Sequence, residues 1–249
     1  MVLSLFKYVK MSNGNDGTRT MKGWMENMKH MRRGIALVLA LLLALGAMGA
    51  FAAEANAVKT VKINKTNFPD AKFRSFVKSN FDTNKDGKLS AKEIKAVKEI
   101  NVKEKGIANL KGVELFVNLE NLDCSYNKLT KLDLSKNKNL DYLYCGNNRL
   151  KTLNVSKITG IRGVSCEYNG MTKLTLGTHK DLFILGVHGN KMKSLDIKGN
   201  KRLIAMVQDK YLVQTSGIRM WYSTEGDIGL VAIDPTMKLM NGKKVLYKP

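Results

Sequence analysis

A pattern of apolar residues recurs every 21 residues between Leu119 and Lys201, and this period constrains the fold more than any other feature. Each copy reads L-x-x-L-x-C-x-x-N-x-L-x-x-L-x-L and ends in a polar turn. Four copies begin at Leu119, Leu140, Ile161 and Leu182, and a fifth begins at Leu203 and fades. A fixed period of roughly 20–29 residues is typical of a solenoid, because each unit can bury its apolar face only against its neighbours. We therefore expect a stack of coils around one continuous core.

Residues at the same position in successive copies form columns of shared chemical character. The apolar column at the second leucine holds Leu122, Leu143, Val164, Leu185 and Met206. A cysteine column holds Cys124, Cys145 and Cys166 and continues at Val187, and an asparagine column holds Asn127, Asn148, Asn169 and Asn190. Stacking places each column at one point of the coil, so we expect buried cysteines that pack as small hydrophobes and asparagines that satisfy turn backbone. A disulfide between adjacent coils is the alternative for the cysteines.

The first copy, LENLDCSYNKLTKLDLSKN from Leu119 to Asn137, resembles the nested leucine-rich repeats called IRREKO. Such repeats occur in secreted and surface proteins of bacteria and are related in style to internalins. The resemblance covers about Val58 to Asp209 and implies a ligand-binding scaffold. The expected fold is an α/β solenoid: β-rich leucine-rich repeats with a helical EF-hand cap at the N-terminal end and a short β cap at the C-terminal end.

The segment from Asp82 to Glu93 matches the calcium-binding loop of an EF-hand. Such a loop takes oxygen ligands at its first, third and fifth positions, a glycine at the sixth, a backbone carbonyl at the seventh, often a water at the ninth, and a bidentate glutamate at the end. The expected calcium ligands are Asp82, Asn84, Asp86, Lys88, Ser90 and Glu93, with Gly87 at the turn. The alternative is a turn rich in Asp and Asn that holds no metal.

Helical patterns flank this loop. Pro69 and Asp70 suit a helix start, and an apolar stripe follows at helical spacing. The stripe comprises Phe73, Phe76, Val77 and Phe81, and a second helix is expected through Ile94, Val97 and Ile100. We expect calcium to bind weakly, on the order of 0.1–1 mM, and to hold a helix pair over the open end of the core. The loop also resembles the N-terminal cap of such bacterial repeat proteins; a dockerin would carry two loops.

A basic and then apolar segment, residues 28–57, reads as a secretory signal peptide. Positive residues from Lys29 to Arg33 precede an apolar run from Gly34 to Phe51, and small residues then offer cleavage sites. An uncleaved membrane anchor is the alternative, since the run has 18 residues and roughly 20 span a bilayer. Residues 1–27 show no pattern, so we expect translation to start at Met28. The protein is then secreted or associated with the bacterial surface, without a further membrane domain.

The net charge is strongly positive. The chain carries +21, and the part from Val58 onward carries +17, because 35 of the 42 Lys and Arg and 18 of the 21 Asp and Glu lie there. Such a charge favours anionic partners such as cell-wall polymers, glycans or membrane surfaces; a lysine-rich exterior without a dedicated partner is the alternative. Secretion argues against nucleic acid as the ligand.

Ligand contacts are expected at exposed strand positions between the buried columns. These positions include Asp123, Ser125, Tyr142, Tyr144, Glu167, Phe183 and His188. We select Tyr142, Tyr144, Phe183 and His188 as candidate ligand-binding residues because aromatic side chains are enriched in binding hot spots. Packing against the C-terminal segment is the alternative. His179 and Asp181 accompany His188, but no nucleophile motif lies beside them, so we expect no enzyme.

The chain therefore divides into an N-terminal cap at 58–104, repeats at 105–209 and a β cap at 210–249. Short apolar stretches at Arg219–Ser223, Gly229–Ile233 and Met237–Tyr247 predict the strands of this last part. The expected function is recognition of a protein or a glycan, with calcium stabilising the cap. The alternative is binding of an anionic cell-wall polymer or membrane surface.

Overall fold

The computed structural model describes residues 60–208, 212–215, 218–223, 229–234 and 236–247. These residues belong to a compact unit, Val58–Pro249, which is separate from Met1–Ala57. The predicted start at Met28 and the predicted signal peptide at 28–57 lie outside the described residues. Within those residues, no helix is long and apolar enough to cross a membrane.

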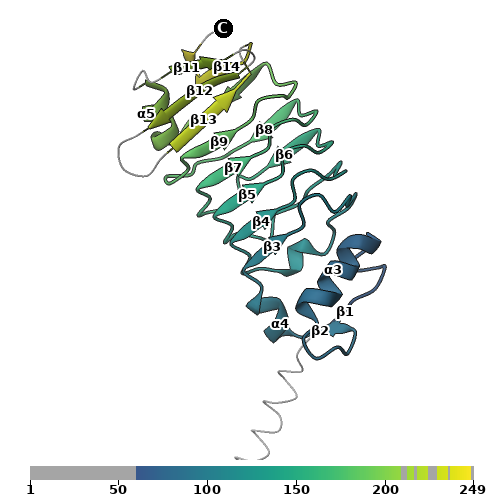
Figure 1. Cartoon of the computed structure of the whole chain (residues 1–249). Coiled ribbons are helices and arrows are strands. Elements are labelled where there is room, and N and C mark those ends of the chain that lie inside the picture. The colour runs from purple at the N-terminus through teal and green to yellow at the C-terminus, as the bar shows by residue number, and fades with distance from the viewer. Residues whose placement is uncertain (1–59, 209–211, 216–217, 224–228, 235, 248–249) are drawn as a thin grey trace, which may run out of the picture. The chain divides into compact units, whose positions relative to one another are not determined.

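A sheet of eight strands in the order β11-β12-β13-β9-β7-β5-β4-β3 runs along one side of the coils (Figure 1). Its first two strands in this order are β11 (Leu212–Thr215) and β12 (Ile218–Ser223). Its six parallel strands are β3 (Glu99–Asn101), β4 (Asn121–Asp123), β5 (Tyr142–Tyr144), β7 (Gly163–Ser165), β9 (Ile184–Gly186) and β13 (Gly229–Ile233). Their central residues align as Ile100, Leu122, Leu143, Val164, Leu185 and Val231, all fully buried. The predicted leucine-rich-repeat solenoid is confirmed.

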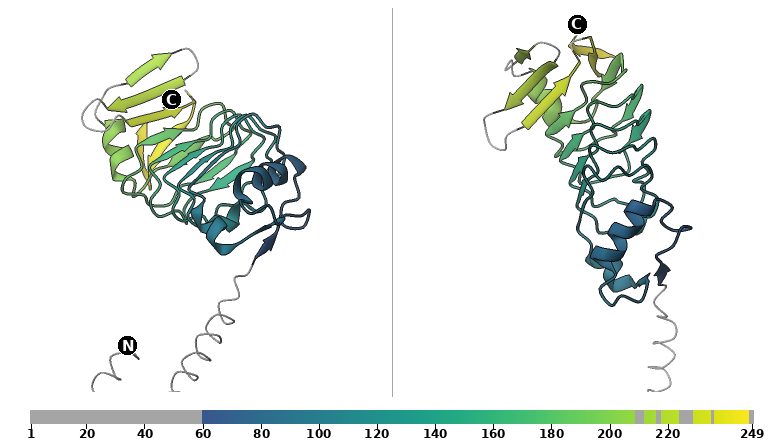
Figure 2. Two further views of the ribbon diagram at one scale, coloured as in Figure 1. Left: turned by 60° about the horizontal axis from the view of Figure 1, so that its bottom comes forward. Right: turned by 45° about the vertical axis from the view of Figure 1, so that its right-hand side comes forward.

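The second half of each coil lies on the other side of the core (Figure 2). There β6 (Thr152–Asn154) pairs in parallel with β8 (Lys173–Thr175), and β10 (Ser194–Asp196) pairs in parallel with β14 (Lys238–Asn241). The last strand, β15 (Lys244–Tyr247), pairs antiparallel with β14. The apolar columns of both half-repeats meet between these layers and form one continuous core. Each coil therefore depends on its neighbours for burial.

The asparagine column ties successive coils together, as predicted. The side-chain oxygen of Asn148 accepts the backbone N–H of Leu129 on the preceding coil at 2.9 Å. Its amide nitrogen donates to the carbonyls of Cys124, Cys145 and Gly146 at 2.9–3.2 Å. The same pattern recurs at Asn127, Asn169 and Asn190. These side chains satisfy buried backbone groups that the turns leave without strand partners.

The three cysteines are unpaired and fully buried, which confirms the packing interpretation over the disulfide. Burial raises the pKa of each thiol, and neighbouring acidic side chains raise it further. Cys124, Cys145 and Cys166 therefore stay protonated at neutral pH and act as small core side chains.

The N-terminal part packs against the first coil. It consists of β1 (Val61–Lys62), α3 (Ala71–Phe81), β2 (Lys88–Leu89) and α4 (Ala91–Ala96). Asp70 caps α3 by accepting the N–H groups of Lys72 and Phe73, and its other oxygen accepts the N–H of Ala108 at 2.8 Å. Phe81 packs edge-on against Phe116, with ring centroids 5.2 Å apart. These contacts fix the helix to the open end of the solenoid.

The predicted second helix is shorter than expected. Helix α4 ends at Ala96, whereas Val97 and Ile100 were expected to continue it. Ile100 instead lies in β3, where it aligns with Leu122 of β4. Its side chain completes the apolar column of the sheet, and this burial outweighs the helical spacing of a short segment. The chain thus begins its first coil at Glu99, ahead of the repeat pattern.

The predicted fifth repeat at Leu203 is wrong. Residues Lys201–Gln208 form helix α5, because Leu203, Met206 and Val207 have helical spacing and share its buried face. The chain then forms β11 (Leu212–Thr215) and β12 (Ile218–Ser223) as an antiparallel pair. Strands β13 and β14 supply the sixth coil by pairing with β9 and β10 of the fifth. The helix and hairpin are therefore an insertion between the fifth and sixth coils.

Candidate functional site

The Asp82–Glu93 loop adopts the sharp turn that its sequence predicts. Lys85 and Gly87 have left-handed φ angles of 59° and 75°. One oxygen of Asp82 accepts the N–H of Asp86 at 3.1 Å, and the other accepts the N–H of Gly87 at 3.0 Å. The Asn84 side-chain oxygen also accepts the N–H of Asp86. The first, third and fifth positions are thereby gathered around one turn of backbone.

Glu93 closes this loop from its far end. One carboxylate oxygen accepts from the backbone and hydroxyl of Thr83, at 2.8 and 2.6 Å, and the other accepts from the backbone and hydroxyl of Ser90, both at 2.8 Å. The Thr83 and Ser90 hydrogen bonds lower the pKa of Glu93 to about 2. Ser90 in turn caps helix α4, so the same residues form a capping box. Glu93 is therefore ionised and held in place at neutral pH.

The residues present fit a cation in charge and ligand chemistry. Asp82 and Glu93 are 5% and 8% exposed, and no Lys or Arg in the described part of the chain forms an ion pair with either. Carboxylate and amide oxygens are the donors that calcium prefers. Across residues 60–247, as far as they are described, no three His, Cys, Asp or Glu side chains are arranged to hold a metal ion. In this structure both carboxylate oxygens of Glu93 accept hydrogen bonds, from Thr83 and from Ser90.

The loop also has a backbone partner. Its Lys88 and Leu89 form β2, which pairs antiparallel with Lys62 and Val61 of β1. The N–H of Ile63 donates to the carbonyl of Gly87 at 3.0 Å. A strand that precedes the first helix thus pairs with this loop, which the sequence pattern did not indicate.

The second candidate site is the outer surface of strands β3, β4, β5, β7 and β9, which we call the sheet face. It comprises Glu99, Asn101, Asn121, Asp123, Tyr142, Tyr144, Gly163, Ser165, Ile184 and Gly186. None of these residues is Lys or Arg, although the chain as a whole carries +21. The sheet face is therefore acidic and aromatic, and the positive charge lies elsewhere.

Two tyrosines form the centre of the sheet face. The rings of Tyr142 and Tyr144 lie parallel within 8°, with centroids 6.5 Å apart. Tyr142 lies over Gly163 of the next coil, where an added Cβ would come within 2.7 Å of its ring. Tyr144 is 40% exposed, and burial raises the pKa of its hydroxyl group, helped by Tyr142 and Asp123. Gly163 thus allows the ring of Tyr142 to lie flat on the sheet.

Glu167 and His188 lie two residues beyond β7 and β9. Glu167 extends over Gly146 and Gly186, where an added Cβ would approach its oxygens to 2.5 and 3.2 Å. One Glu167 oxygen and the His188 Nδ1 are buried without a hydrogen-bond partner. Buried polar groups are costly to leave without a hydrogen-bond partner, so these two atoms mark a part of the surface that the fold alone does not optimise.

The structure corrects two expectations about exposure. Phe183 precedes β9 and is only 8% exposed, because its ring packs edge-on against Tyr142 and beneath the guanidinium of Arg202. Ser125 is 7% exposed and donates its hydroxyl to Asp123 at 2.6 Å. Neither side chain is free on the surface. Tyr142, Tyr144 and His188 remain accessible in part.

Two exposed tyrosines escaped the sequence analysis. Tyr126 and Tyr168 each precede an asparagine of the inner column, and both are 51% exposed. Both have left-handed φ angles, 56° and 50°. The signal was present in the sequence, because the same position holds Asn147 and Gly189 in the other coils, and Asn and Gly favour that conformation.

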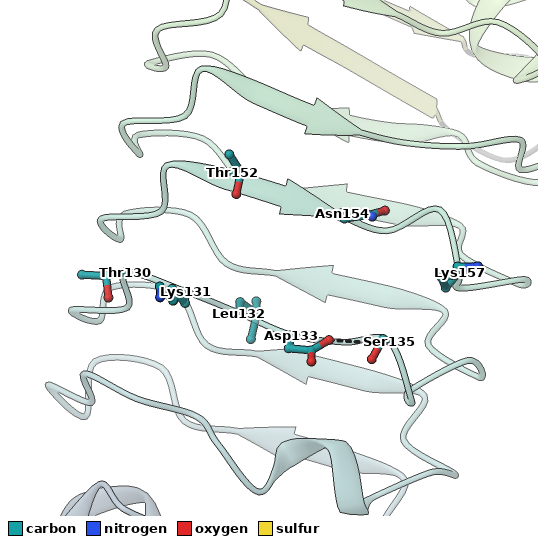
Figure 3. Close-up of a pocket in the computed structure, with 8 residues that line it drawn as sticks. All are labelled: Thr130, Lys131, Leu132, Asp133, Ser135, Thr152, Asn154 and Lys157. Carbon is teal, nitrogen blue, oxygen red and sulfur yellow. Dashed lines mark hydrogen bonds between the residues drawn. The ribbon is translucent and has the colours of Figure 1, made fainter.

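Two shallow clefts lie on the opposite side of the coils from the sheet face. Their volumes are about 270 and 350 Å³, and Figure 3 shows the first. Exposed lysines line them: Lys111, Lys131, Lys136 and Lys157. The Ser135 N–H donates to Asp133 at 2.9 Å and, with the Ser135 hydroxyl and Lys136, lowers the pKa of Asp133. None of the four lysines pairs with an acid in the described part of the chain.

The histidine and aspartate considered for catalysis have other contacts. His179 is 2% exposed, and its Nε2 lies 2.5 Å from the Leu176 carbonyl. Asp181 lies 3.6 Å from the neighbouring Lys180. The absence of enzymatic activity stays a prediction.

Residues 117–157 match the family model described as leucine-rich repeats in two copies. Over 70 residues, or 28% of the chain, the sequence is 33% identical to Internalin J of Listeria monocytogenes serotype 4b (strain F2365), and the match spans 8% of that protein. The solved functional domain of InlJ from Listeria monocytogenes, described as including a cysteine ladder, has a TM-score of 0.51 at 29% identity, over 59% of this chain and 32% of that one. An internalin (inlF) from the same species gives 0.44 at 20% identity, over 57% and 53%.

Proposed function

We propose that this internalin-like leucine-rich-repeat protein is secreted or displayed on the bacterial surface and binds a protein or glycan ligand through its sheet face. The chain spans a small part of the relatives that it matches, so the ligand is inferred from the residues of this chain. The stacked strands present a flat surface with exposed aromatic and acidic groups, and such surfaces serve recognition in solenoid proteins.

The packing of Tyr142 over Gly163 carries this proposal. A stable solenoid does not need aromatic rings on its outer face, and Tyr144 leaves 40% of its surface exposed. Rings that are already fixed lose little conformational entropy when a ligand covers them. Tyrosines held in this way are typical anchors of binding hot spots.

A binding screen tests the sheet face. The chain from Val58 onward is immobilised and probed with purified mucin, bacterial cell-wall fragments and a panel of extracellular proteins. Replacing both rings, Tyr142→Ser with Tyr144→Ser, is expected to reduce binding of the captured ligand tenfold or more, because two hot-spot anchors at about 1–2 kcal/mol each are removed. Surface plasmon resonance measures the affinity.

The matched control lies on the other side of the core. Ser194 of β10 is exposed there and lines neither lysine-lined cleft, so Ser194→Ala should bind as the wild type does. Equal affinity of the tyrosine variant and the control would show that the ligand does not use the sheet face.

Calcium is the second part of the proposal. Asp82, Asn84, Asp86 and Glu93 would hold the ion through side-chain oxygens, Lys88 through its carbonyl and Ser90 through a water. The bound cation would neutralise the buried carboxylates of Asp82 and Glu93. Because Asp70 and Phe81 join this region to the first coil, the ion would stabilise the end of the solenoid.

Thermal unfolding with and without calcium tests this role. Calcium should raise the melting temperature of the Val58–Pro249 unit, and Glu93→Gln should remove that rise. Glu104→Gln is a suitable control, because Glu104 is exposed and lies outside the loop. A wild-type melting curve that is the same in calcium and in chelator would contradict a structural calcium site.

The lysine-lined clefts favour a second candidate function, binding of an anionic cell-wall polymer. Lys131 lines both clefts, and Lys136 and Lys157 lie at the turns beside it. Binding of this kind weakens steeply as salt rises, because exposed charges are screened. Lys131→Gln with Lys157→Gln should therefore reduce retention on purified wall polymer at low salt. Retention that does not change with salt would count against this function.

A further inference from the structure

One edge of the sheet carries a column of residues in the left-handed conformation. Glu104, Tyr126, Asn147 and Tyr168 have φ angles of 50–56°, and Gly189 follows at 69°. Backbone N–H groups of this column donate to the next coil, for example Tyr126 to Gly146 and Tyr168 to His188. The residues therefore occupy equivalent turns that follow parallel strands of the sheet.

Tyrosine is poorly suited to this position. A left-handed backbone brings Cβ close to the following carbonyl, and only Gly, Asn and Asp adopt it readily. Asn147 and Gly189 show that the turn forms without a tyrosine. The rings of Tyr126 and Tyr168 are also half exposed, at 51% each. Two coils thus retain a strained, exposed aromatic residue that the fold does not require, and such residues concentrate at functional sites.

The residues around the rings of Tyr126 and Tyr168 indicate which class of ligand binds them. Tyr168 packs edge-on against His188, with centroids 5.0 Å apart, and the Lys103 ammonium lies 5.2 Å from the Tyr126 ring centroid. The tyrosines belong to the column Glu104, Tyr126, Asn147, Tyr168 and Gly189. The column immediately before it holds Lys103, Ser125, Gly146, Glu167 and His188. No aliphatic side chain is among them. A protein hot spot is normally enclosed by apolar contacts that exclude water. Here the Tyr126 ring lies beside the Lys103 ammonium, and the Tyr168 ring lies beside His188 and over Gly189.

We infer that Tyr126 and Tyr168 are stacking platforms for an extended glycan chain that runs along the solenoid axis. A sugar ring offers an apolar C–H face to an aromatic ring and hydroxyl groups to the polar side chains around it. The platforms are two coils apart, about 10 Å at the usual strand spacing, so they contact separate sugar units of one linear chain. The side chains of Glu167 and His188 are partly exposed in the neighbouring column and offer polar groups to the sugar hydroxyls, and His188 lies against the Tyr168 ring.

This inference rests on the proposed function and narrows its ligand to a linear glycan. It is tested with the Val58–Pro249 unit and linear β-linked oligomers of glucose and of N-acetylglucosamine, by calorimetry and by tyrosine fluorescence. Tyr126→Asn and Tyr168→Asn should each reduce affinity about fivefold or more. The same substitutions should leave the urea midpoint unchanged or higher, because Asn relieves the left-handed strain.

Ring-retaining variants provide the matched control. Tyr126→Phe and Tyr168→Phe should keep most of the affinity, since the stacking surface is preserved. The inference is overturned if no oligomer binds the wild type, if the Asn variants bind as tightly as the wild type, or if they unfold at lower urea. A second outcome separates this inference from the proposed function. If no oligomer binds, but a protein ligand binds the wild type and fails to bind the variant with Tyr142→Ser and Tyr144→Ser, the proposed function holds and the glycan inference is wrong.

Discussion

Removal of the Asn148 side chain should destabilise the solenoid more than any surface change of similar size. Asn148 is 9% exposed and makes four hydrogen bonds to backbone groups of its own and the preceding coil. We consider Asn148→Ala, which deletes all four bonds and adds no new group.

The loss of unfolding free energy can be estimated from the hydrogen bonds that each former partner of Asn148 retains. The N–H of Leu129 donates only to Asn148, so it becomes an unpaired buried donor, at about 1–3 kcal/mol. The carbonyls of Cys124 and Cys145 still accept from Asn127 and Asn169, and that of Gly146 still accepts from Tyr126. Three weakened acceptors add roughly 0.5 kcal/mol each. The expected loss is about 2.5–4.5 kcal/mol of unfolding free energy.

Urea unfolding of the Val58–Pro249 unit, followed by far-ultraviolet circular dichroism, measures this loss. With a slope of about 2–3 kcal/mol per molar urea, the midpoint should fall by about 1–2 M. Asn139→Ala is the control, because Asn139 is exposed and makes one hydrogen bond, to the Val117 carbonyl at 3.2 Å. Equal midpoints for the two variants would refute the reasoning that buried asparagines hold the coils together.

Three further predictions concern stability and chemistry. The folded pKa of Glu93 is lowered from 4.5 to about 2, so its ionised form stabilises the fold above about pH 4.5 and this contribution is lost as the pH falls toward 2; Glu93→Gln in chelator should reduce the fall of the urea midpoint over that range. The buried thiols of Cys124, Cys145 and Cys166 have raised pKa values, so a thiol reagent at pH 8 should label them at the unfolding rate, and rapid labelling of native protein would contradict their burial. Leu143→Asp should unfold several coils in one transition, because Leu143 is fully buried and each coil depends on its neighbours; loss of a single coil by hydrogen exchange would argue otherwise.

Some residues of the candidate sites could be identified from the sequence and others could not. The calcium-type loop depends on residues within Asp82–Glu93, so spacing alone was enough to propose it. The packing of Phe183 against Tyr142 and Arg202 was not visible, because those partners lie far apart along the chain. The strained tyrosines were missed for a different reason. Their conformation is clear only when Tyr126 and Tyr168 are read beside Asn147 and Gly189.

The sequence by itself determined the solenoid, its inner columns and the local turn of the loop, because these follow from a repeated 21-residue spacing and from neighbours in the chain. Only the tertiary structure decided where the repetition begins and ends. Ile100 belongs to a strand and Leu203 to a helix because each is placed where it buries most apolar surface. The tertiary structure also separated the acidic, aromatic sheet face from the lysine-lined clefts, because charge on a folded surface depends on which side of the coil each residue faces.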